Sequence, residues 1–298
     1  MYYEGNPIMS DEAFDRLAEQ HGYTSVGYDP GQDSIAHSYR MYSLQKVYTD
    51  EKYPELGKDL VITPKLDGAA VSLTYIEGKL SLGLTRGDGI LGKDITENMK
   101  QIVPARVKLE TMFQVTGEVV APKDIPNARN YAAGALGLKD PEEFNTRQLT
   151  FIAYDAQPSF FSGDYIEDLT LLGRMGFYIV TQSDWKQFPQ DGVVFRVNNR
   201  EQYEKMGYTS KHPRGAFALK ERKKGKISKL LDVIWQVGKS GVVSPVAILE
   251  PVDIDGAKVS RATLHNMKYI EDLDLEIGCN VEVIRSGEII PRVVSRVD

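Results

Sequence analysis

An antiparallel hairpin is the sequence feature that most restricts how this chain can fold. Residues 71–75 and 80–86 each alternate apolar with small or polar side chains, and Glu77-Gly78 lies between them. Such alternation on both sides of a glycine-containing turn is typical of paired strands. Further strand candidates lie at residues 114–120, 150–154, 192–197 and 216–220, and helix-like stretches lie at 94–102 and 166–175. The central part of the chain therefore predicts antiparallel strands with helices between them.

The two ends of the chain have different patterns. Residues 10–18 predict a short helix, because Ser10 or Asp11 can cap its first turn and apolar residues follow at helical spacing. Residues 22–38 are rich in Gly, Asp, Ser and Pro and predict a loop. Near the C-terminus, residues 281–285 and 289–294 predict a second hairpin, in which Pro291 indicates an edge position or a bulge. Short strands at this spacing favour a small β-barrel.

The overall composition bounds the class of protein. The 298 residues allow two or three units. No apolar run approaches the roughly 20 residues needed to span a bilayer. No signal segment opens the sequence either, which predicts a cytoplasmic protein. The single cysteine, Cys279, excludes an internal disulfide framework and a cysteine-rich zinc site.

Positive charge is concentrated in one stretch, although the formal net charge is −6. The basic residues between positions 211 and 229 are Lys211, Arg214, Lys220, Arg222, Lys223, Lys224, Lys226 and Lys229. Clustered cations gain affinity for a phosphate backbone because binding releases counterions. The stretch therefore predicts either a polyanionic partner or a solvated positive face.

A lysine at a predicted strand end is the candidate nucleophile. Lys65 begins the sequence Lys-Leu-Asp-Gly after the strand-like run 60–64, and a lone pattern of this kind also suits a salt-bridged turn. Other charged residues follow in order at strand ends, namely Arg86, Glu118, Asp191 and Lys220. Because a strand projects alternate side chains to one face, such residues can gather in a cleft while their neighbours pack behind them. The ordered set, more than Lys65 alone, indicates a catalytic site.

This ordered set resembles the motifs of the covalent nucleotidyltransferases, the superfamily of DNA ligases, RNA ligases and mRNA capping enzymes. Thr-Arg-Gly-Asp-Gly at 85–89, Gly-Lys-Asp-Ile-Thr-Glu-Asn at 92–98 and Pro-Asn-Ala-Arg-Asn-Tyr-Ala-Ala-Gly at 126–134 resemble the NAD-dependent DNA ligases of bacteria and bacteriophages in particular. Gln-Val-Gly-Lys-Ser-Gly at 236–241 and Val-Ser-Arg-Ala-Thr-Leu-His-Asn at 259–266 do so as well. The resemblance covers nearly the whole chain.

The resemblance implies an α+β protein with three parts. A nucleotidyltransferase domain of the ATP-grasp-like ligase type, with antiparallel sheets and flanking helices, would occupy residues 46–226. An OB-fold β-barrel would follow at 227–298, and a short helical arm that binds the nicotinamide mononucleotide half of NAD would precede it at 1–45.

The resemblance also implies a reaction that starts at Lys65. A lysine amine is a nucleophile only when unprotonated, and a free lysine with a pKa near 10.4 holds little of that form at pH 7. Burial, nearby cations and a bound Mg²⁺ would all disfavour the ammonium. Lys65 would attack the α-phosphorus of NAD, release nicotinamide mononucleotide and keep AMP. The AMP would pass to the 5′-phosphate of a nick, and the 3′-hydroxyl would displace it to seal the strand.

The resemblance assigns roles to the residues around the nucleotide. Lys65, Lys220 and Asp191 would be catalytic, with Lys220 neutralising the α-phosphate as charge develops. Glu118 would bind the ribose hydroxyls, and Glu118 and Asp191 would support Mg²⁺ through water. Tyr154 would stack on adenine. The complete set of expected cofactor-binding residues is Asp11, Phe14, Asp15, Ser43, Leu44, Thr63, Lys65, Arg86, Glu118, Tyr154, Arg196, Arg214 and Lys220.

The choice of NAD over ATP depends on the N-terminus. NAD-dependent ligases hold the nicotinamide half with a helical arm, and residues 10–15 resemble the core of that arm. Asp11 and Asp15 match acids of the arm, and Phe14 stands where the family usually has tyrosine. The implied cofactors are therefore NAD and Mg²⁺.

Three positions near the predicted site depart from the family pattern. Thr63 stands two residues before Lys65, where the family normally has glutamate. Thr116 stands two residues before Glu118, where arginine is common. Arg196 replaces a lysine, and a planar guanidinium is not equivalent to a point charge. We expect these changes to shift nucleotide affinity without abolishing activity.

The chain is also short for the resembled family, whose typical members add a four-cysteine zinc module, helix–hairpin–helix repeats and a BRCT domain. We expect these modules to be absent from this sequence, which would be either a compact natural form or one piece of a longer or split enzyme. The expected protein is a minimal NAD-dependent DNA ligase that acts as a monomer on nicked double-stranded DNA, alone or with a second ligase subunit. Two other functions stay open: a nick-binding module with little or no turnover, and an ATP- or GTP-using relative such as an RNA ligase or capping enzyme.

Overall fold

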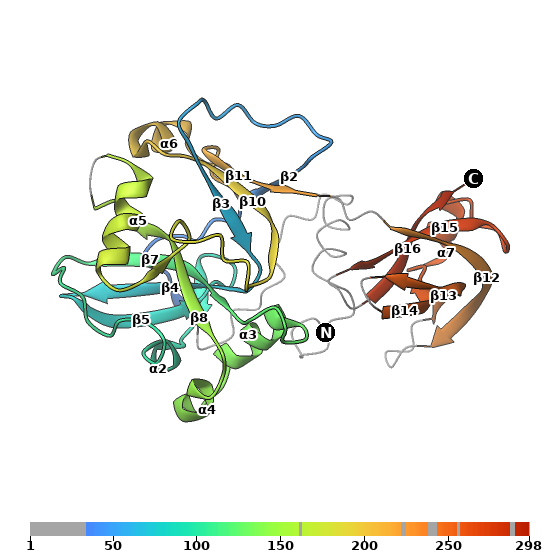
Figure 1. Cartoon of the computed structure of the whole chain (residues 1–298), viewed down its shortest axis with the longest axis horizontal. Coiled ribbons are helices and arrows are strands. Elements are labelled where there is room, and N and C mark those ends of the chain that lie inside the picture. Colours follow the sequence, from blue (N-terminus) through green and yellow to red (C-terminus); the bar gives the residue numbers. More distant parts are fainter. Residues whose placement is uncertain are drawn as a thin grey trace. The chain divides into compact units, whose positions relative to one another are not determined.

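The computed structural model describes residues 34–160, 163–221, 225–237, 243–254, 257–286 and 290–297. They divide into a larger unit that ends at Glu221 and a smaller unit that follows it (Figure 1). The division falls inside the basic stretch. Over these ranges, the structure has no helix that is both long and apolar enough for a membrane span. The predicted helical arm, with Asp11, Phe14 and Asp15, lies outside the described residues.

The first sheet of the larger unit contains the predicted hairpin. Its five strands run in the order β5 (Lys79–Thr85), β4 (Ala69–Ile76), β7 (Phe113–Val120), β8 (Thr150–Gln157) and β9 (Tyr178–Ile179). The β4–β7 and β7–β8 pairs are antiparallel, as is the β4–β5 hairpin. Glu77 and Gly78 both have positive φ, 51° and 71°, which suits a tight turn between twisted strands. The hairpin prediction is confirmed.

A second, four-stranded sheet lies in the same unit. Its order is β2 (Gln45–Tyr48), β11 (Ala216–Lys220), β10 (Gln190–Val197) and β3 (Leu60–Leu66). The β10–β11 and β10–β3 pairs are antiparallel, and β2 joins β11 in parallel. A two-stranded ladder forms between β1 (Ser34–Ala36) and β6 (Leu91–Lys93). The loop prediction for residues 22–38 is therefore wrong at β1, which is ordered by a partner nearly 60 positions away.

Few and short helices accompany these sheets. They are α2 (Thr96–Met99), α3 (Ala128–Leu136), α4 (Pro141–Asn145), α5 (Tyr165–Arg174) and α6 (Arg200–Met206). The helix predicted at 94–102 is reduced to α2. Asp94 Oδ1 accepts hydrogen bonds from Thr96 at the helix start, and Pro104 disfavours helical backbone just before it. The helix predicted at 166–175 is confirmed as α5.

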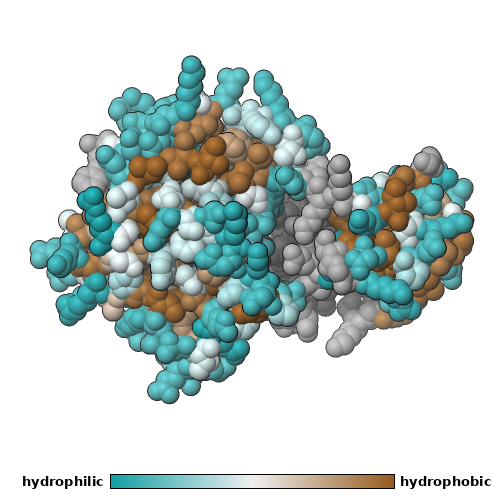
Figure 2. Space-filling view, viewed as in Figure 1, coloured by the Kyte–Doolittle hydropathy of each residue, from teal (hydrophilic) through white to brown (hydrophobic). Residues whose placement is uncertain are grey.

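The larger unit has two clusters of buried hydrophobic residues. The five-stranded sheet packs with α3, α4 and α5 around Tyr75, Phe113 and Phe144, and the rings of Tyr75 and Phe113 stack at 5.2 Å. The four-stranded sheet packs a smaller core with α6 on its other face. A cavity of about 400 Å³ lies on this face, lined in part by Leu60, Phe195 and Phe217. Figure 2 shows hydrophobic residues exposed over the same sheet.

The smaller unit is a closed five-stranded barrel. Its order is β12 (Lys226–Val237), β13 (Val243–Ile254), β14 (Ala257–Thr263), β16 (Ile290–Val297) and β15 (Asn280–Ser286), and β15 pairs with β12 to close it. Helix α7 (Met267–Asp272) lies between β14 and β15 in sequence. This strand order, with one parallel contact between β14 and β16, is that of an OB fold.

The barrel is filled by residues such as Leu230, Leu249 and Leu264. Pro291 does not lie on an edge strand, because β16 pairs with neighbours on both sides. It precedes the single bridge to β14, which begins at Arg292, so its missing N–H interrupts no ladder there. The predicted α+β fold followed by an OB barrel is confirmed. The sheets of the larger unit, predicted to be antiparallel, are mixed, because β2 joins β11 and β9 joins β8 in parallel.

Candidate active site

Three residues predicted as catalytic meet in the larger unit. Lys65 lies near the end of β3, Asp191 near the start of β10 and Lys220 at the end of β11. Lys65 Nζ donates to Asp191 Oδ1 at 2.8 Å, across 126 positions of sequence. Lys220 Nζ donates to Asp191 Oδ2 at 2.7 Å. One carboxylate therefore holds two ammonium groups side by side.

Two glycines shape the backbone around this cluster. A side chain at Gly68, directly after Lys-Leu-Asp, would bring its Cβ to 2.2 Å from Val119 O, so β7 can approach only a glycine. Gly192 has φ 141°, and β10 shifts its register against β3 at this point. A bulge of this kind turns side chains away from the regular alternation. It directs Asp191 to the lysines of the strands on both sides.

The electrostatic environment keeps Asp191 ionised. Burial alone would raise the pKa of the Asp191 carboxyl, but the ammoniums of Lys65 and Lys220 hold it below its usual range. The side chains of Lys65 and Asp191 are each 26% exposed, and that of Lys220 is 14% exposed. The cluster is thus accessible to a ligand, while Asp191 serves as a fixed negative charge at neutral pH.

Glu118 lies on β7 of the other sheet, within electrostatic range of the same cluster. Burial raises the pKa of the Glu118 carboxyl to about 7, although Lys65, Arg86 and Arg129 all favour its ionised form. Arg86 follows β5, where its N–H donates to Ala70 O at 3.0 Å, and Ala70 is the register partner of Glu118. The hairpin β4–β5 therefore places Arg86 beside β4, the strand next to the one that carries Glu118, and its charge acts on Glu118 from there.

Tyr154 lies on β8, the strand next to β7. Burial raises the pKa of the Tyr154 hydroxyl far above its usual value, and the charge of Glu118 adds to this effect. The phenol therefore stays neutral. Its backbone oxygen accepts a hydrogen bond from the Tyr165 hydroxyl at 2.6 Å, which fixes the strand beneath the ring.

Ser43, Leu44 and Arg214 lie around the segment that leads into β11. Ser43 Oγ lies 3.1 Å from His212 Nδ1, and the same nitrogen lies 3.0 Å from Ser43 O. Leu44 packs against the core of the four-stranded sheet. Arg214 is exposed and donates to Tyr208 O at 3.0 Å. Ser43 and Leu44 are thus connected to β11, the strand that ends at Lys220.

The three departures from the family pattern occupy buried positions. Thr63 lies on β3 opposite Val194 of β10, and Thr116 lies on β7 opposite Asp155 of β8. Arg196 is directed to that same carboxylate, with Nη1 3.1 Å from Asp155 Oδ2. Arg196 therefore engages Asp155 and not the Asp191 cluster, and its contact with a nucleotide stays a prediction.

Comparison with known proteins decides the family. Residues 31–184, about half of the chain, match the family described as the NAD-dependent DNA ligase adenylation domain. Residues 227–298 match the NAD-dependent DNA ligase OB-fold domain. The chain belongs to the NAD-dependent DNA ligase family. The predicted resemblance is confirmed, and the barrel is the OB-fold domain of this family.

Similar proteins named DNA ligase support this membership. This chain is 31% identical to the DNA ligase of Sulfurovum sp. strain NBC37-1, over 98% of this chain and 55% of that protein. It is 33% identical to the DNA ligase of Campylobacter lari, over 98% and 54%. It is 36% identical to that of Wolinella succinogenes, over 89% and 48%. The chain spans about half the length of these relatives.

Two charged residues at this ligase-family site were not selected from the sequence. Arg129 Nη1 lies 3.3 Å from Asp67 Oδ1, which places the start of α3 beside the Lys-Leu-Asp-Gly turn. Burial raises the pKa of Asp67, and the charge of Arg129 opposes that rise. A signal was available, since Asp67 lies in the Lys-Leu-Asp-Gly motif and Arg129 in the 126–134 block.

The described part of the site contains carboxylates that could take part in binding a metal ion. Among the residues that the structure describes, no group of three or more His, Cys, Asp or Glu side chains is placed to hold a metal ion. Mg²⁺ usually keeps several waters and binds through one or two carboxylates plus substrate phosphates. Glu118 and Asp191 are compatible with an ion held in that way, mostly by water and phosphate.

Proposed function

We propose that this chain is an NAD-dependent DNA ligase that seals nicks between a 5′-phosphate and a 3′-hydroxyl in duplex DNA. The observation that carries the proposal is the Asp191 carboxylate held between Lys65 and Lys220. This arrangement puts a nucleophilic amine beside a cation that can neutralise the phosphate under attack. Membership of the ligase family supports the same reaction.

The first step would form a covalent enzyme–AMP intermediate. The lone pair of unprotonated Lys65 Nζ forms a bond to the α-phosphorus of NAD, and the bond from that phosphorus to the oxygen of nicotinamide mononucleotide breaks. The proton lost from Nζ can leave to solvent, because the Lys65 side chain is 26% exposed, while Asp191 stays ionised. Asp191 also aims Nζ, which lowers the entropy that the attack must lose. Lys220 would stabilise the charge that develops on the phosphate oxygens.

The surrounding side chains would bind the adenylate half. Glu118 in its ionised form would accept hydrogen bonds from the ribose hydroxyls, and Arg86 would contact the ribose or phosphate. Tyr154 would stack on adenine, supported by its hydrogen-bonded strand. Ser43, Leu44, Thr63 and Arg214 would line the remaining pocket walls.

NAD and Mg²⁺ would be the cofactors. Specificity for NAD would come from Asp11, Phe14 and Asp15, which lie outside the described residues, and the match to the NAD-dependent adenylation domain supports it. Mg²⁺ would lie near Glu118 and Asp191, and when bound it would neutralise phosphate oxygens. The OB barrel would hold the nicked duplex, as its family match suggests.

Adenylation can be tested directly on the whole chain. The protein is incubated with Mg²⁺ and either NAD or ATP labelled in the adenylate group, and bound label is read after denaturing electrophoresis. We expect label from NAD, little from ATP, and none in Lys65→Ala. Lys186→Ala is a matched control, because that lysine is exposed and pairs only locally with Asp184. A nicked duplex with a 5′-phosphate should discharge the label, whereas one with a 5′-hydroxyl should not.

The outcomes distinguish the competing functions. Undiminished label in Lys65→Ala would overturn the proposed nucleophile. Label from ATP in preference to NAD would favour an ATP-using relative. If only nicked RNA discharges the label, the substrate is RNA and the proposed DNA ligase activity is wrong. Tight binding of nicked DNA without any label from either nucleotide would favour a nick-binding module.

A further inference from the structure

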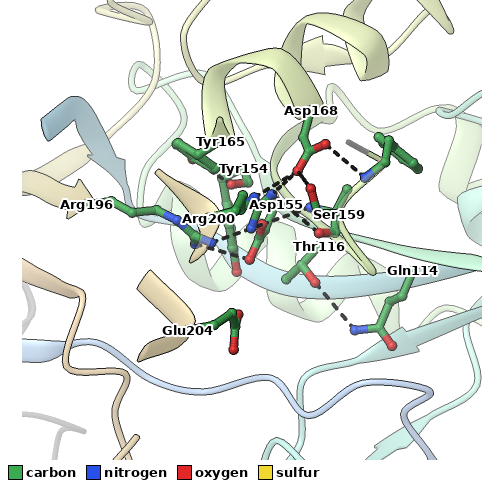
Figure 3. A network of polar contacts seen from close by, with 12 residues as sticks. Gln114, Thr116, Tyr154, Asp155, Ser159, Tyr165, Asp168, Arg196, Arg200 and Glu204 are labelled. Carbon is green, nitrogen blue, oxygen red and sulfur yellow. Dashed lines mark hydrogen bonds and ion pairs between the residues drawn. The ribbon is translucent and has the colours of Figure 1, made fainter. Parts of the chain in front are cut away.

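A buried chain of ion pairs joins the five-stranded and four-stranded sheets of the larger unit (Figure 3). Asp155 of β8 accepts from Arg196 of β10, with Nη1 to Oδ2 at 3.1 Å. The other carboxylate oxygen, Oδ1, lies 3.0 Å from Nη1 of Arg200, the first residue of α6. Arg200 also reaches Asp168 of α5, with Nη2 to Oδ2 at 2.7 Å. Strands β8 and β10 and helices α5 and α6 thus share one network.

This network lies almost entirely out of water. Arg196 and Arg200 are 8% and 7% exposed, and Asp168 is fully buried. Taking charges out of water costs several kcal/mol for each ion, and well-packed hydrophobic residues often hold a core as firmly. Arg196 Nε even lacks a hydrogen-bond partner. Unlike hydrophobic packing, ion pairs with hydrogen-bond geometry fix the orientation of the groups that they join.

The residues in this network lie next to two parts of the proposed nucleotide site, namely Tyr154 on β8 and the Lys65–Asp191 cluster at β10. Asp155 directly follows Tyr154, whose backbone oxygen is held by the Tyr165 hydroxyl. The Arg196 guanidinium lies over the rings of Tyr165 and Tyr203, 4.3 and 4.2 Å from their centroids. Arg196 also shares strand β10 with the Asp191 cluster. The network therefore connects the strand of the adenine-stacking candidate to the strand of the catalytic carboxylate.

The small residue opposite Asp155 makes room for this arrangement. Thr116 of β7 is the register partner of Asp155 and is itself buried and uncharged. The positive charge around Asp155 comes from Arg196 and Arg200, which hold the pKa of its carboxyl below the usual range against the effect of burial. Asp155 is therefore ionised and paired at neutral pH.

We infer that Asp155, Arg196 and Arg200 are positioning residues that set Tyr154 against the Lys65–Asp191 cluster, and that Arg196 acts through Asp155 without touching the nucleotide. This inference rests on the proposed function, because it needs the adenylate to lie between the two sheets. It reassigns Arg196 from a direct cofactor contact to a residue that holds the pocket in shape.

A double-mutant cycle on the whole protein tests the inference. The variants are Asp155→Asn, Arg196→Gln and the double variant, and each is measured for NAD binding by calorimetry and for the kcat and KM of enzyme–AMP formation. We expect Asp155→Asn to raise the KM and Kd for NAD about tenfold while kcat changes less than about threefold. The double variant should be no worse than either single variant, because the paired charges disappear together.

Two further variants keep the result interpretable. Glu201→Gln, on the same helix as Arg200, removes an exposed pair with Lys205 and should change nothing. Arg196→Lys keeps the charge but loses the planar fork, so it should resemble Asp155→Asn in its KM. If Asp155→Asn fails to fold by thermal melting, Arg196→Lys and the charge-balanced double variant decide the question.

The contrary results are specific. Additive losses in the double variant, or a normal KM in both Asp155→Asn and Arg196→Lys, would overturn the inference. A loss in kcat alone would also contradict it, since it would make Arg196 a catalytic group. If the wild type binds NAD but takes no label, the proposed function fails while the Kd values still test the network. If the wild type neither binds NAD nor takes label, both fail together.

Discussion

At the residue scale, the protonation of Glu118 links the proposed chemistry to stability. Its pKa is raised from 4.5 to about 7 by burial, so the folded protein binds this proton more tightly than the unfolded chain does. Ionisation of Glu118 therefore costs folding free energy as the pH rises from about 4.5 to about 7. Only the ionised carboxylate of Glu118 offers both of its oxygens as acceptors to the two ribose hydroxyls.

The first prediction concerns the pH dependence of enzyme–AMP formation. If the ionised form of Glu118 is required, the rate should rise about tenfold between pH 6 and pH 8 and then level off. A rate limited by loss of the lysine proton would instead keep rising toward pH 10. Single-turnover labelling across this range separates the two, and a flat profile from pH 6 to pH 8 would contradict the role of Glu118.

The second prediction concerns the stability of a Glu118→Gln variant. Removing the buried charge should raise the denaturation midpoint at pH 8, by the equivalent of up to about 3 kcal/mol. The variant and the wild type should differ little near pH 4.5, where both are neutral at this position. Urea titrations at the two pH values measure this difference. The variant should also lose labelling, although it is more stable than the wild type. An equal shift at both pH values would exclude the electrostatic explanation.

At the scale of the elements, the site depends on strands that approach one another closely. The Lys-Leu-Asp-Gly turn lies against β7, and a β10 bulge aims Asp191 at two neighbouring strands. Sequence alternation predicted these strands, including β11 at residues 216–220, because burial of one face leaves a local signal. It did not predict β1 or the short extent of α2, since both depend on contacts with distant residues.

The third prediction tests the close approach at Gly68. Gly68→Ala should lower stability by more than about 2 kcal/mol and abolish labelling, because the new methyl group would meet Val119 O and push β7 and Glu118 away. Gly134→Ala is the matched control, since the space beside Gly134 in α3 is open. That change should be neutral or should stabilise the helix by up to about 1 kcal/mol. Equal behaviour of the two variants in urea titration would argue against a steric requirement.

At the scale of the whole molecule, the basic stretch is divided between the two units. Lys220 belongs to β11 and the proposed active site, whereas Lys226 and Lys229 belong to β12 of the barrel. The stretch thus contributes to both units. With a formal net charge of −6, attraction to DNA must come from such local clusters, which salt screens.

The fourth prediction concerns the salt dependence of nick binding. Affinity for a nicked duplex should fall at least about tenfold between 50 and 200 mM salt. Lys229→Glu should weaken binding and reduce the slope of log affinity against log salt by about 1 or more. Lys268→Glu is an exposed control on α7, outside the basic stretch, and should change the slope less. If Lys268→Glu has the larger effect in filter-binding or anisotropy titrations, the barrel binds DNA through another face.

The sequence by itself determined the strand-rich class, the OB barrel and the ordered charged residues, because alternation and short motifs are local properties of the chain. The tertiary structure decided which charges meet. Asp191 joins Lys65 across 126 positions only because a bulge in β10 turns its side chain toward both flanking strands. Arg196 was expected at the nucleotide, yet it pairs with Asp155, since strand register and the small Thr116 leave that carboxylate within its reach. Such pairings depend on how two sheets pack together, and no local pattern records that.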